Sequence, residues 1–103
     1  MKPPSKVVVG ATRFAIELTA DLEGYGDTTI AKSRIRVQKG MDVHAERDTV
    51  MHEVLHALLE NVGLAYEMRE DDYEEKVVRR LAPALLDLLR RNPRLVQYLT
   101  SPA

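Results

Sequence analysis

The chain has 103 residues, of which 45% are hydrophobic and 30% are charged, and its formal net charge is −1. This length suits one hydrophobic core, so we expect a single domain over residues 1–103. The near balance of 15 basic and 16 acidic side chains argues against nucleic acid as the main partner. The apolar runs are too short for a membrane span or a signal peptide, and cysteine is absent. We therefore expect a cytoplasmic protein without disulfides.

The first part of the chain has the composition and alternation of β-strands. Residues 7–9 form a β-branched run, and Phe14, Ile16 and Leu18 alternate with Ala15 and Glu17. A helix over this stretch is the alternative, because several of its apolar residues also fall on one helical face. After a glycine-rich turn, a strand-like region begins at about Ile30. It is clearest at Arg34, Ile35, Arg36 and Val37, where the arginines should face solvent and the other two residues the core.

The second part has helical periodicity. Asp48 is the predicted N-cap of a first helix that ends at Gly63, a residue type that favours the left-handed conformation at helix ends. A second helix is expected over about residues 72–91, and Pro83 should kink or split it. Asn92, followed by proline, predicts the start of a short last helix. The expected fold is α+β: a meander of about three strands packed on the first helix and a second long helix.

The first helix contains HEVLH, from His52 to His56, which matches the HExxH pattern. Residues i and i+4 share a helix face, so the two imidazoles can supply two zinc ligands at roughly 2.0–2.1 Å. Glu53 points to the neighbouring side, where it can take a proton from a water on the metal and pass it to a leaving amine. An ordinary amphipathic helix is less favoured, because each buried histidine would need its own hydrogen-bond partner.

A catalytic zinc also needs a third protein ligand and an open position for water. No further histidine follows HEVLH in the manner of HExxHxxGxxH, and no cysteine is present, so the ligand should come from the second helix. Glu74 and Glu75 are the candidates, and helical geometry slightly favours Glu74. Both also have an ordinary interpretation, because acids in a first helical turn suit the helix dipole.

HExxH followed by a helix bearing glutamate resembles the gluzincins, in particular the minimal ImmA/IrrE-like and phage-encoded metallopeptidases. In that group the second helix carries a pattern like E-x-x-A-N-x-F-A-x-x-L-L, whose glutamate is the third zinc ligand. The resemblance covers roughly residues 34–89 and selects Glu75 as the ligand, whereas Val78 and Arg79 depart from the Ala-Asn pair. It implies a zincin-like fold and a zinc metallopeptidase that acts on a protein or peptide.

In zincins an edge strand beside the active-site helix binds the extended substrate through backbone hydrogen bonds. The resemblance assigns this substrate-binding role to Arg34, Ile35, Arg36 and Val37. The two arginines serve equally well to protect an edge strand from aggregation. Because one domain lacks the second lobe of a deep cleft, we expect a shallow site that acts on a flexible segment of a particular protein, such as a phage or host regulator.

The main alternative is a non-catalytic zinc-binding regulatory or assembly protein that keeps the site for stability. A structural site would close its fourth position, and His44 is the spare histidine, although a solvated loop is its ordinary interpretation. Tyr66 and Tyr73 could stabilise an oxyanion, but covering a helix junction is the commoner role for an aromatic. The C-terminal arginines are expected to form a solvated face, and the sequence leaves the oligomeric state open.

Overall fold

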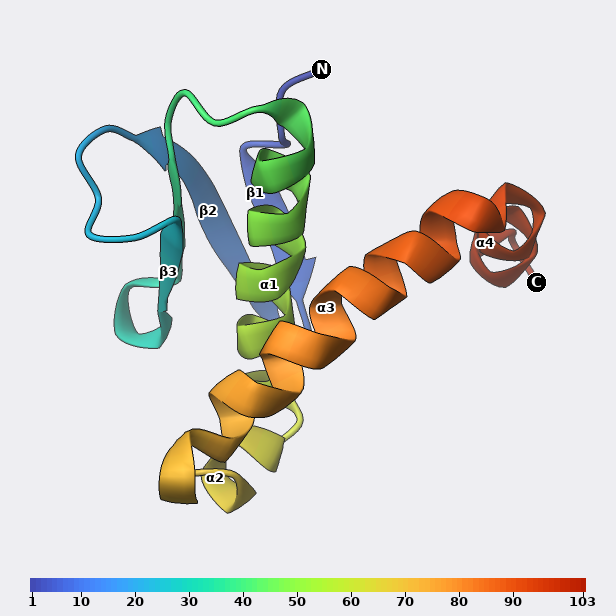
Figure 1. Cartoon of the computed structure of the whole chain (residues 1–103). Helices are drawn as coiled ribbons and strands as arrows, with labels where there is room; N and C mark the ends of the chain where they lie inside the picture. Colours follow the sequence, from blue (N-terminus) through green and yellow to red (C-terminus); the bar gives the residue numbers. More distant parts are fainter.

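The computed structural model describes residues 1–103, and none of its helices is long and apolar enough to cross a membrane. A sheet is followed by helices, which confirms the predicted α+β class (Figure 1). The strands are β1 (Lys6–Val9), β2 (Thr12–Thr19), β3 (Gly26–Thr29) and β4 (Arg34–Gln38). The helices are α1 (Val43–Asn61), α2 (Leu64–Glu67), α3 (Tyr73–Arg91) and α4 (Pro93–Thr100), with 3₁₀ turns η1 (Ile30–Lys32) and η2 (Glu70–Asp72).

The four strands of the sheet are arranged in the order β1-β2-β4-β3. The pairs β1–β2 and β3–β4 are antiparallel, whereas the pair β2–β4 is parallel. The sheet therefore has one strand more than expected and is not a simple meander. β3 precedes β4 in the sequence but lies outside it, so β3 is an edge strand.

The prediction of a substrate-binding edge strand is wrong for Arg34, Ile35, Arg36 and Val37. These residues lie in β4, which pairs with β2 on one side and β3 on the other. Their backbone groups are engaged in the sheet, so they cannot take up a substrate by strand addition. The predicted alternation is confirmed, because Ile35 and Val37 are fully buried while the two arginines are half-buried on the other face. Ile30 lies in η1 and not in a strand.

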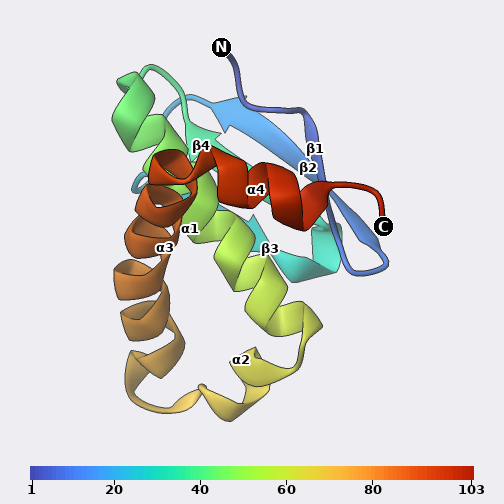
Figure 2. The same cartoon turned by 90° about the vertical axis from the view of Figure 1, so that its right-hand side faces the viewer.

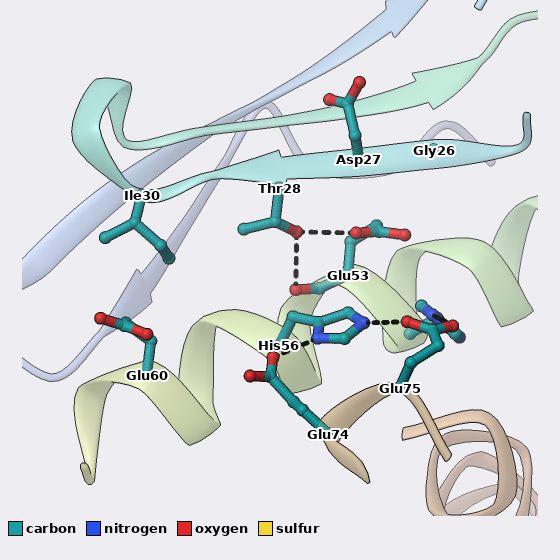
Figure 3. Close-up of a pocket in the computed structure, with 10 residues that line it drawn as sticks. Gly26, Asp27, Thr28, Ile30, Glu53, His56, Glu60, Glu74 and Glu75 are labelled. Atoms are coloured by element: carbon teal, nitrogen blue, oxygen red, sulfur yellow. Dashed lines mark hydrogen bonds and ion pairs between the residues drawn. The ribbon is translucent and has the colours of Figure 1, made fainter. Parts of the chain in front are cut away.

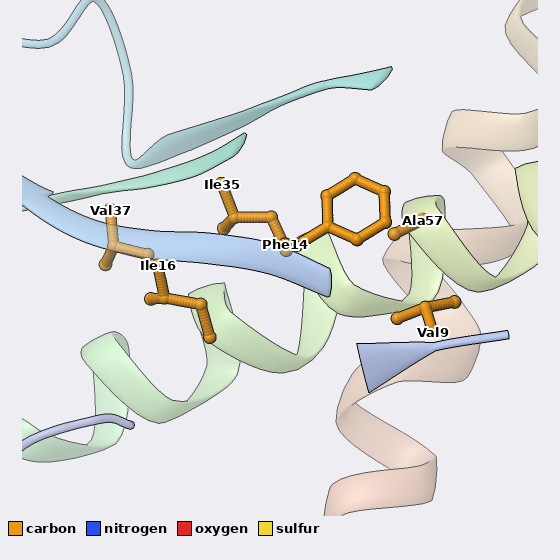
Figure 4. Packing of buried hydrophobic residues seen from close by; sticks show 6 residues of the cluster. All are labelled: Val9, Phe14, Ile16, Ile35, Val37 and Ala57. Atoms are coloured by element: carbon orange, nitrogen blue, oxygen red, sulfur yellow. The ribbon is translucent and has the colours of Figure 1, made fainter. Parts of the chain in front are cut away.

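Helix α1 covers one face of the sheet, and the main core fills the space between them (Figure 1). Figure 4 shows this cluster: Val9, Phe14, Ile16, Ile35, Val37 and Ala57. In β2, Phe14 and Ile16 are buried while the residues beside them are exposed, as the period of two for a half-buried strand requires. This result excludes the alternative of a helix in this part of the chain.

Helix α3 packs against α1 on the side away from the sheet, so that α1 is the middle layer (Figure 2). The second cluster lies at this contact and consists of Leu55, Leu59, Ala65, Val78 and Ala82. α3 is continuous from Tyr73 to Arg91, so the split considered at Pro83 does not occur. Pro83 is exposed, and Val78 and Ala82, which precede it, pack in the cluster with α1, which stabilises the helix despite the missing N–H donor.

Helix α1 begins earlier than predicted, because Asp42 and not Asp48 is its N-cap. The Asp42 carboxylate accepts hydrogen bonds from the backbone N–H groups of His44 and Ala45, at 2.9 and 3.0 Å. These bonds, that of Ala45 first, hold the pKa of Asp42 below its ordinary value. His44 therefore lies in the first turn of α1, where the sequence predicted a loop.

Candidate metal centre

The two histidines of HEVLH lie one turn apart on α1 and face the beginning of α3. Their ring centroids are 5.0 Å apart, and the ring planes meet at 60°. The side chain of His52 is 25% exposed and that of His56 is 18% exposed. Both imidazoles are therefore mostly buried but remain partly exposed.

Glu75, in the first turn of α3, contacts both histidines. Its Oε1 lies 2.9 Å from Nε2 of His52, and its Oε2 lies 2.8 Å from Nε2 of His56. The three residues each offer one ligand atom, and these atoms all lie within 4.8 Å of one another. The structure thus brings together the ligand set expected from the sequence, in a group that could hold a metal ion.

Glu74, the other candidate ligand, contacts the opposite nitrogen of His56 (Figure 3). Its Oε2 lies 2.5 Å from Nδ1, whereas Glu75 lies against Nε2. A histidine that binds a metal through Nε2 carries its proton on Nδ1, and a carboxylate at Nδ1 fixes both the tautomer and the ring orientation. Glu74 is therefore placed to orient a ligand and does not belong to the donor group.

Glu53 lies beside this donor group, on the side of α1 that faces β3, and is only 7% exposed. The Thr28 hydroxyl lies 2.8 Å from Oε1 of Glu53 and 3.1 Å from its backbone carbonyl oxygen, and can donate to either (Figure 3). Burial raises the pKa of Glu53, and the hydrogen bond from Thr28 opposes this effect. A buried carboxylate with a raised pKa next to a metal-ligand group is suited to proton transfer.

The close approach of β3 to α1 depends on Gly26. A Cβ atom at this position would lie 2.7 Å from the carbonyl oxygen of Arg36 and 2.8 Å from Cγ2 of Thr49. The side chain of Asp27 points to the other face of the sheet, where Nε of Arg36 donates to it at 2.9 Å. This bond holds the pKa of Asp27 below its ordinary value. The sequence predicts no role for Gly26 or Thr28, because this segment has the composition of a turn.

Two hollows meet at the donor group. The first has a volume of about 330 Å³ and is lined by Gly26, Asp27, Thr28, Ile30, His52, Glu53, His56, Glu60, Glu74 and Glu75. The second has a volume of about 460 Å³ and is lined by Tyr25, Gly26, Asp48, Thr49, His52, Glu53, Glu75, Arg79 and Pro83. His52, Glu53 and Glu75 line both hollows. They therefore lie in the floor of one open groove bounded by β3 and α3.

Three other residues considered from the sequence lie outside this groove. His44 precedes His52 by eight residues on α1, which places it roughly 12 Å away along the helix axis. It therefore cannot close a fourth ligand position. Tyr66 and Tyr73 line a separate hollow, in which the guanidinium carbon of Arg69 lies 4.0 Å from the centre of the Tyr66 ring. Neither tyrosine lines the groove that contains the donor group.

No family model, curated protein or solved structure matches the chain. Its chemistry is therefore inferred from the geometry of the groove. That geometry combines a histidine and glutamate group able to hold a metal ion with a buried carboxylate next to it. Both the donor group and this carboxylate line the groove.

Proposed function

We propose that this protein is a zinc-dependent metallopeptidase that hydrolyses a peptide bond in a protein substrate. The observation that carries the proposal is that His52, His56 and Glu75 form the donor group, while Glu53 lies beside it and is not part of it. Structural zinc sites have four protein ligands, whereas catalytic sites have three and leave one position for water. The group here has three members and opens into a groove, which favours catalysis.

The donor set fits zinc. Two imidazoles and one carboxylate are a common set in catalytic zinc sites, where they bind at about 2.0–2.2 Å in a tetrahedral arrangement. Neighbouring ligand atoms in such a site are roughly 3.3 Å apart. The oxygens of Glu75 lie 2.8 and 2.9 Å from the histidine nitrogens, so a small outward movement of Glu75 would make room for the ion. Hard ions such as magnesium prefer all-oxygen sites, which this group does not offer.

Zinc bound in this group would polarise the scissile carbonyl and lower the pKa of a water molecule to about 7. Glu53 would take the proton from that water and transfer it to the leaving amine. The raised pKa of Glu53, caused first by burial, makes the carboxylate a stronger base for taking the proton at the first step. Thr28 holds the carboxylate through Oε1 and leaves the second oxygen, Oε2, to carry the proton.

β3 is the strand best placed to bind the substrate. It is one of the two edge strands, and residues of β3 line the groove that contains the donor group. An extended segment could pair with its free backbone groups, as in β-augmentation. β3 thus takes the role that the sequence assigned to β4. Because the groove is open, we expect a flexible segment of a particular protein as substrate and little general proteolysis.

The metal and the reaction can be tested separately with three proteins: wild type, His56→Ala and Glu53→Gln. We expect about one zinc per chain in wild type and in Glu53→Gln, and none in His56→Ala, because His56 belongs to the donor group and Glu53 does not. Wild type should cleave members of a peptide library, and Glu53→Gln should be slower by about 10²–10⁴-fold. Glu46→Gln, also on α1 but outside the groove, is the control and should match wild type in both measurements.

Each outcome has a distinct meaning. If wild type binds no zinc after reconstitution, the metal site is refuted and the peptidase proposal falls with it. If zinc binds as expected but Glu53→Gln cleaves as fast as wild type, or wild type cleaves no peptide, the peptidase proposal alone is refuted. A zinc-binding protein without catalysis would then be the better description.

A further inference from the structure

Helix α3 carries an apolar stripe whose first residue is half-buried and whose other three residues are exposed. The stripe consists of Val77, Leu81, Ala84 and Leu88, spaced three or four residues apart and hence on one side of the helix. Leu81 is 45% exposed and Leu88 is 47% exposed. The side that packs on α1 is a different one, marked by Val78 and Ala82, which are fully buried. We name the four residues the α3 stripe.

The chain as a whole exposes more surface than a compact monomer of its size. Its accessible surface is 7611 Å², whereas a compact protein of 11.7 kDa exposes roughly 5,900 Å². The radius of gyration is 14.0 Å, against about 12.8 Å for a compact domain of this length. Figure 1 shows the reason: the end of α3 and all of α4 project beyond the other elements. The excess of roughly 1,700 Å² exceeds the roughly 800 Å² that each partner buries in a standard interface.

Opposite charges lie on the two sides of the stripe along the chain. Five of the six residues from 70 to 75 are acidic. From Lys76 to Arg94 there are six basic residues and a single acid, and three of the bases, Arg90, Arg91 and Arg94, lie at the far end. The midpoint between the acidic segment and these arginines falls close to Leu81 and Ala84. A second identical chain, placed antiparallel, would therefore bring its acidic end to the basic end of the first.

We propose that a second copy of this chain covers the α3 stripe, with the two α3 helices antiparallel about a two-fold axis. Val77 of one chain then lies near Leu88 of the other. Leu81 likewise lies near Ala84, so that the two-fold axis passes between positions 81 and 84. A parallel pair would instead place acids against acids and bases against bases. No stripe residue lines the groove, and the acids at positions 70–72 also lie outside it, so this proposal does not depend on the proposed function.

The absence of cysteine permits a direct test by disulfide cross-linking. Single-cysteine variants are made at the middle of the stripe (Ala84→Cys), at its end (Leu88→Cys) and on the exposed turn η1 (Ala31→Cys) as control. A disulfide forms only where two Cα atoms come within about 7 Å. Under mild oxidation Ala84→Cys should become mostly covalent dimer, while Leu88→Cys and the control stay mostly monomeric. A mixture of Val77→Cys and Leu88→Cys should cross-link between the two variants.

Sedimentation equilibrium then measures the association itself. Wild type should be dimeric at tens of micromolar, and Leu88→Glu should weaken the dimer at least tenfold, because each interface would contain two desolvated carboxylates. Val8→Glu is the control: it changes an exposed valine in β1 opposite Arg13 and should leave the dimer unchanged. A wild-type protein that stays monomeric overturns the proposal, even if the stripe binds lipid vesicles or another protein. Equal self-cross-linking of Leu88→Cys and Ala84→Cys overturns the antiparallel arrangement.

Discussion

Thr28 and Glu53, 25 positions apart in the sequence, are joined by a hydrogen bond of 2.8 Å between the threonine hydroxyl and Oε1 of the carboxylate. The bond connects the edge strand β3 to the helix that carries both histidines (Figure 3). Without it, the Glu53 carboxylate would be buried with little to balance its loss of hydration. The same contact therefore holds β3 against α1 and fixes the proposed general base.

Replacing Thr28 by valine keeps the shape of the side chain and removes the hydrogen bond. A hydrogen bond to a charged group contributes roughly 1.5–3 kcal/mol, so we expect a loss of about tenfold to a hundredfold in kcat/KM. The pKa of Glu53 should rise further, since Thr28 lowers it in wild type. The acid limb of the pH–rate profile should therefore move to higher pH, while zinc content stays at the wild-type level.

Thr28→Ser is the matched control for this change, because it keeps the hydroxyl. It should retain most of the activity and the position of the acid limb. A pH profile of Thr28→Val that coincides with that of wild type would show that the hydroxyl has no influence on the Glu53 carboxylate.

The change Glu74→Gln tests the contact with Nδ1 of His56. We expect zinc affinity to fall by about 10–100-fold, which is typical when a partner that orients a ligand histidine is lost. The measurement is competition with a chromophoric chelator at constant pH. Glu60→Gln is the control, since Glu60 lines the same hollow and has no hydrogen bond to either histidine. Equal affinities for the two variants would mean that Glu74 does not orient His56.

The part of the site that lies within one helix could be predicted from the sequence, because helical spacing fixes its geometry. His52, Glu53 and His56 occupy the positions that HExxH requires. The third ligand was harder to predict, since Glu74 and Glu75 are adjacent and periodicity slightly favoured the first. Which of the two reaches the histidine Nε2 atoms depends on how α3 is rotated against α1, and helical periodicity does not give this rotation. Glu75 was selected only by the second-helix pattern of the group that the sequence resembles.

The strand β3 could not be predicted in the same way. Its sequence, GDTT, contains no apolar residue and so gives no alternation, and its position depends on pairing with β4. The predicted start of α1 was wrong for a related reason. Both Asp42 and Asp48 are good N-cap residues, and the choice between them depends on where the chain leaves the sheet.

Gly26 should tolerate no side chain, because a Cβ atom would meet the backbone of β4 and a side chain of α1. We expect Gly26→Ala to move β3 away from α1 and to lower the free energy of unfolding by about 1–3 kcal/mol. Urea unfolding of the metal-free protein measures this change. Thr29→Ala, in the same strand, has no such contact and should have a much smaller effect. A Gly26→Ala protein as stable as wild type would contradict the tight packing of β3 against α1.

The stability of the metal-free protein should fall as pH rises above neutrality, whereas the stabilisation by zinc should grow. Burial disfavours the charged form of His56, but hydrogen bonds to Glu74 and Glu75 outweigh it and raise its pKa above the ordinary value. This contribution to stability is complete below the unfolded pKa of about 6.5 and is lost as pH rises through the folded pKa. Zinc requires neutral His56, so a proton competes with the ion over the same range.

Thermal unfolding at pH 6 and pH 8, with and without zinc, measures both effects. The metal-free protein should have the lower Tm at pH 8, and the increase in Tm caused by zinc should be larger at pH 8 than at pH 6. Asp27 and Asp42, whose pKa values are lowered, titrate well below this range and cannot produce the change. His56→Ala should remove the response to zinc and reduce the pH dependence of the metal-free form. A wild-type Tm that rises from pH 6 to pH 8 without zinc would show that the two glutamates do not hold a proton on His56.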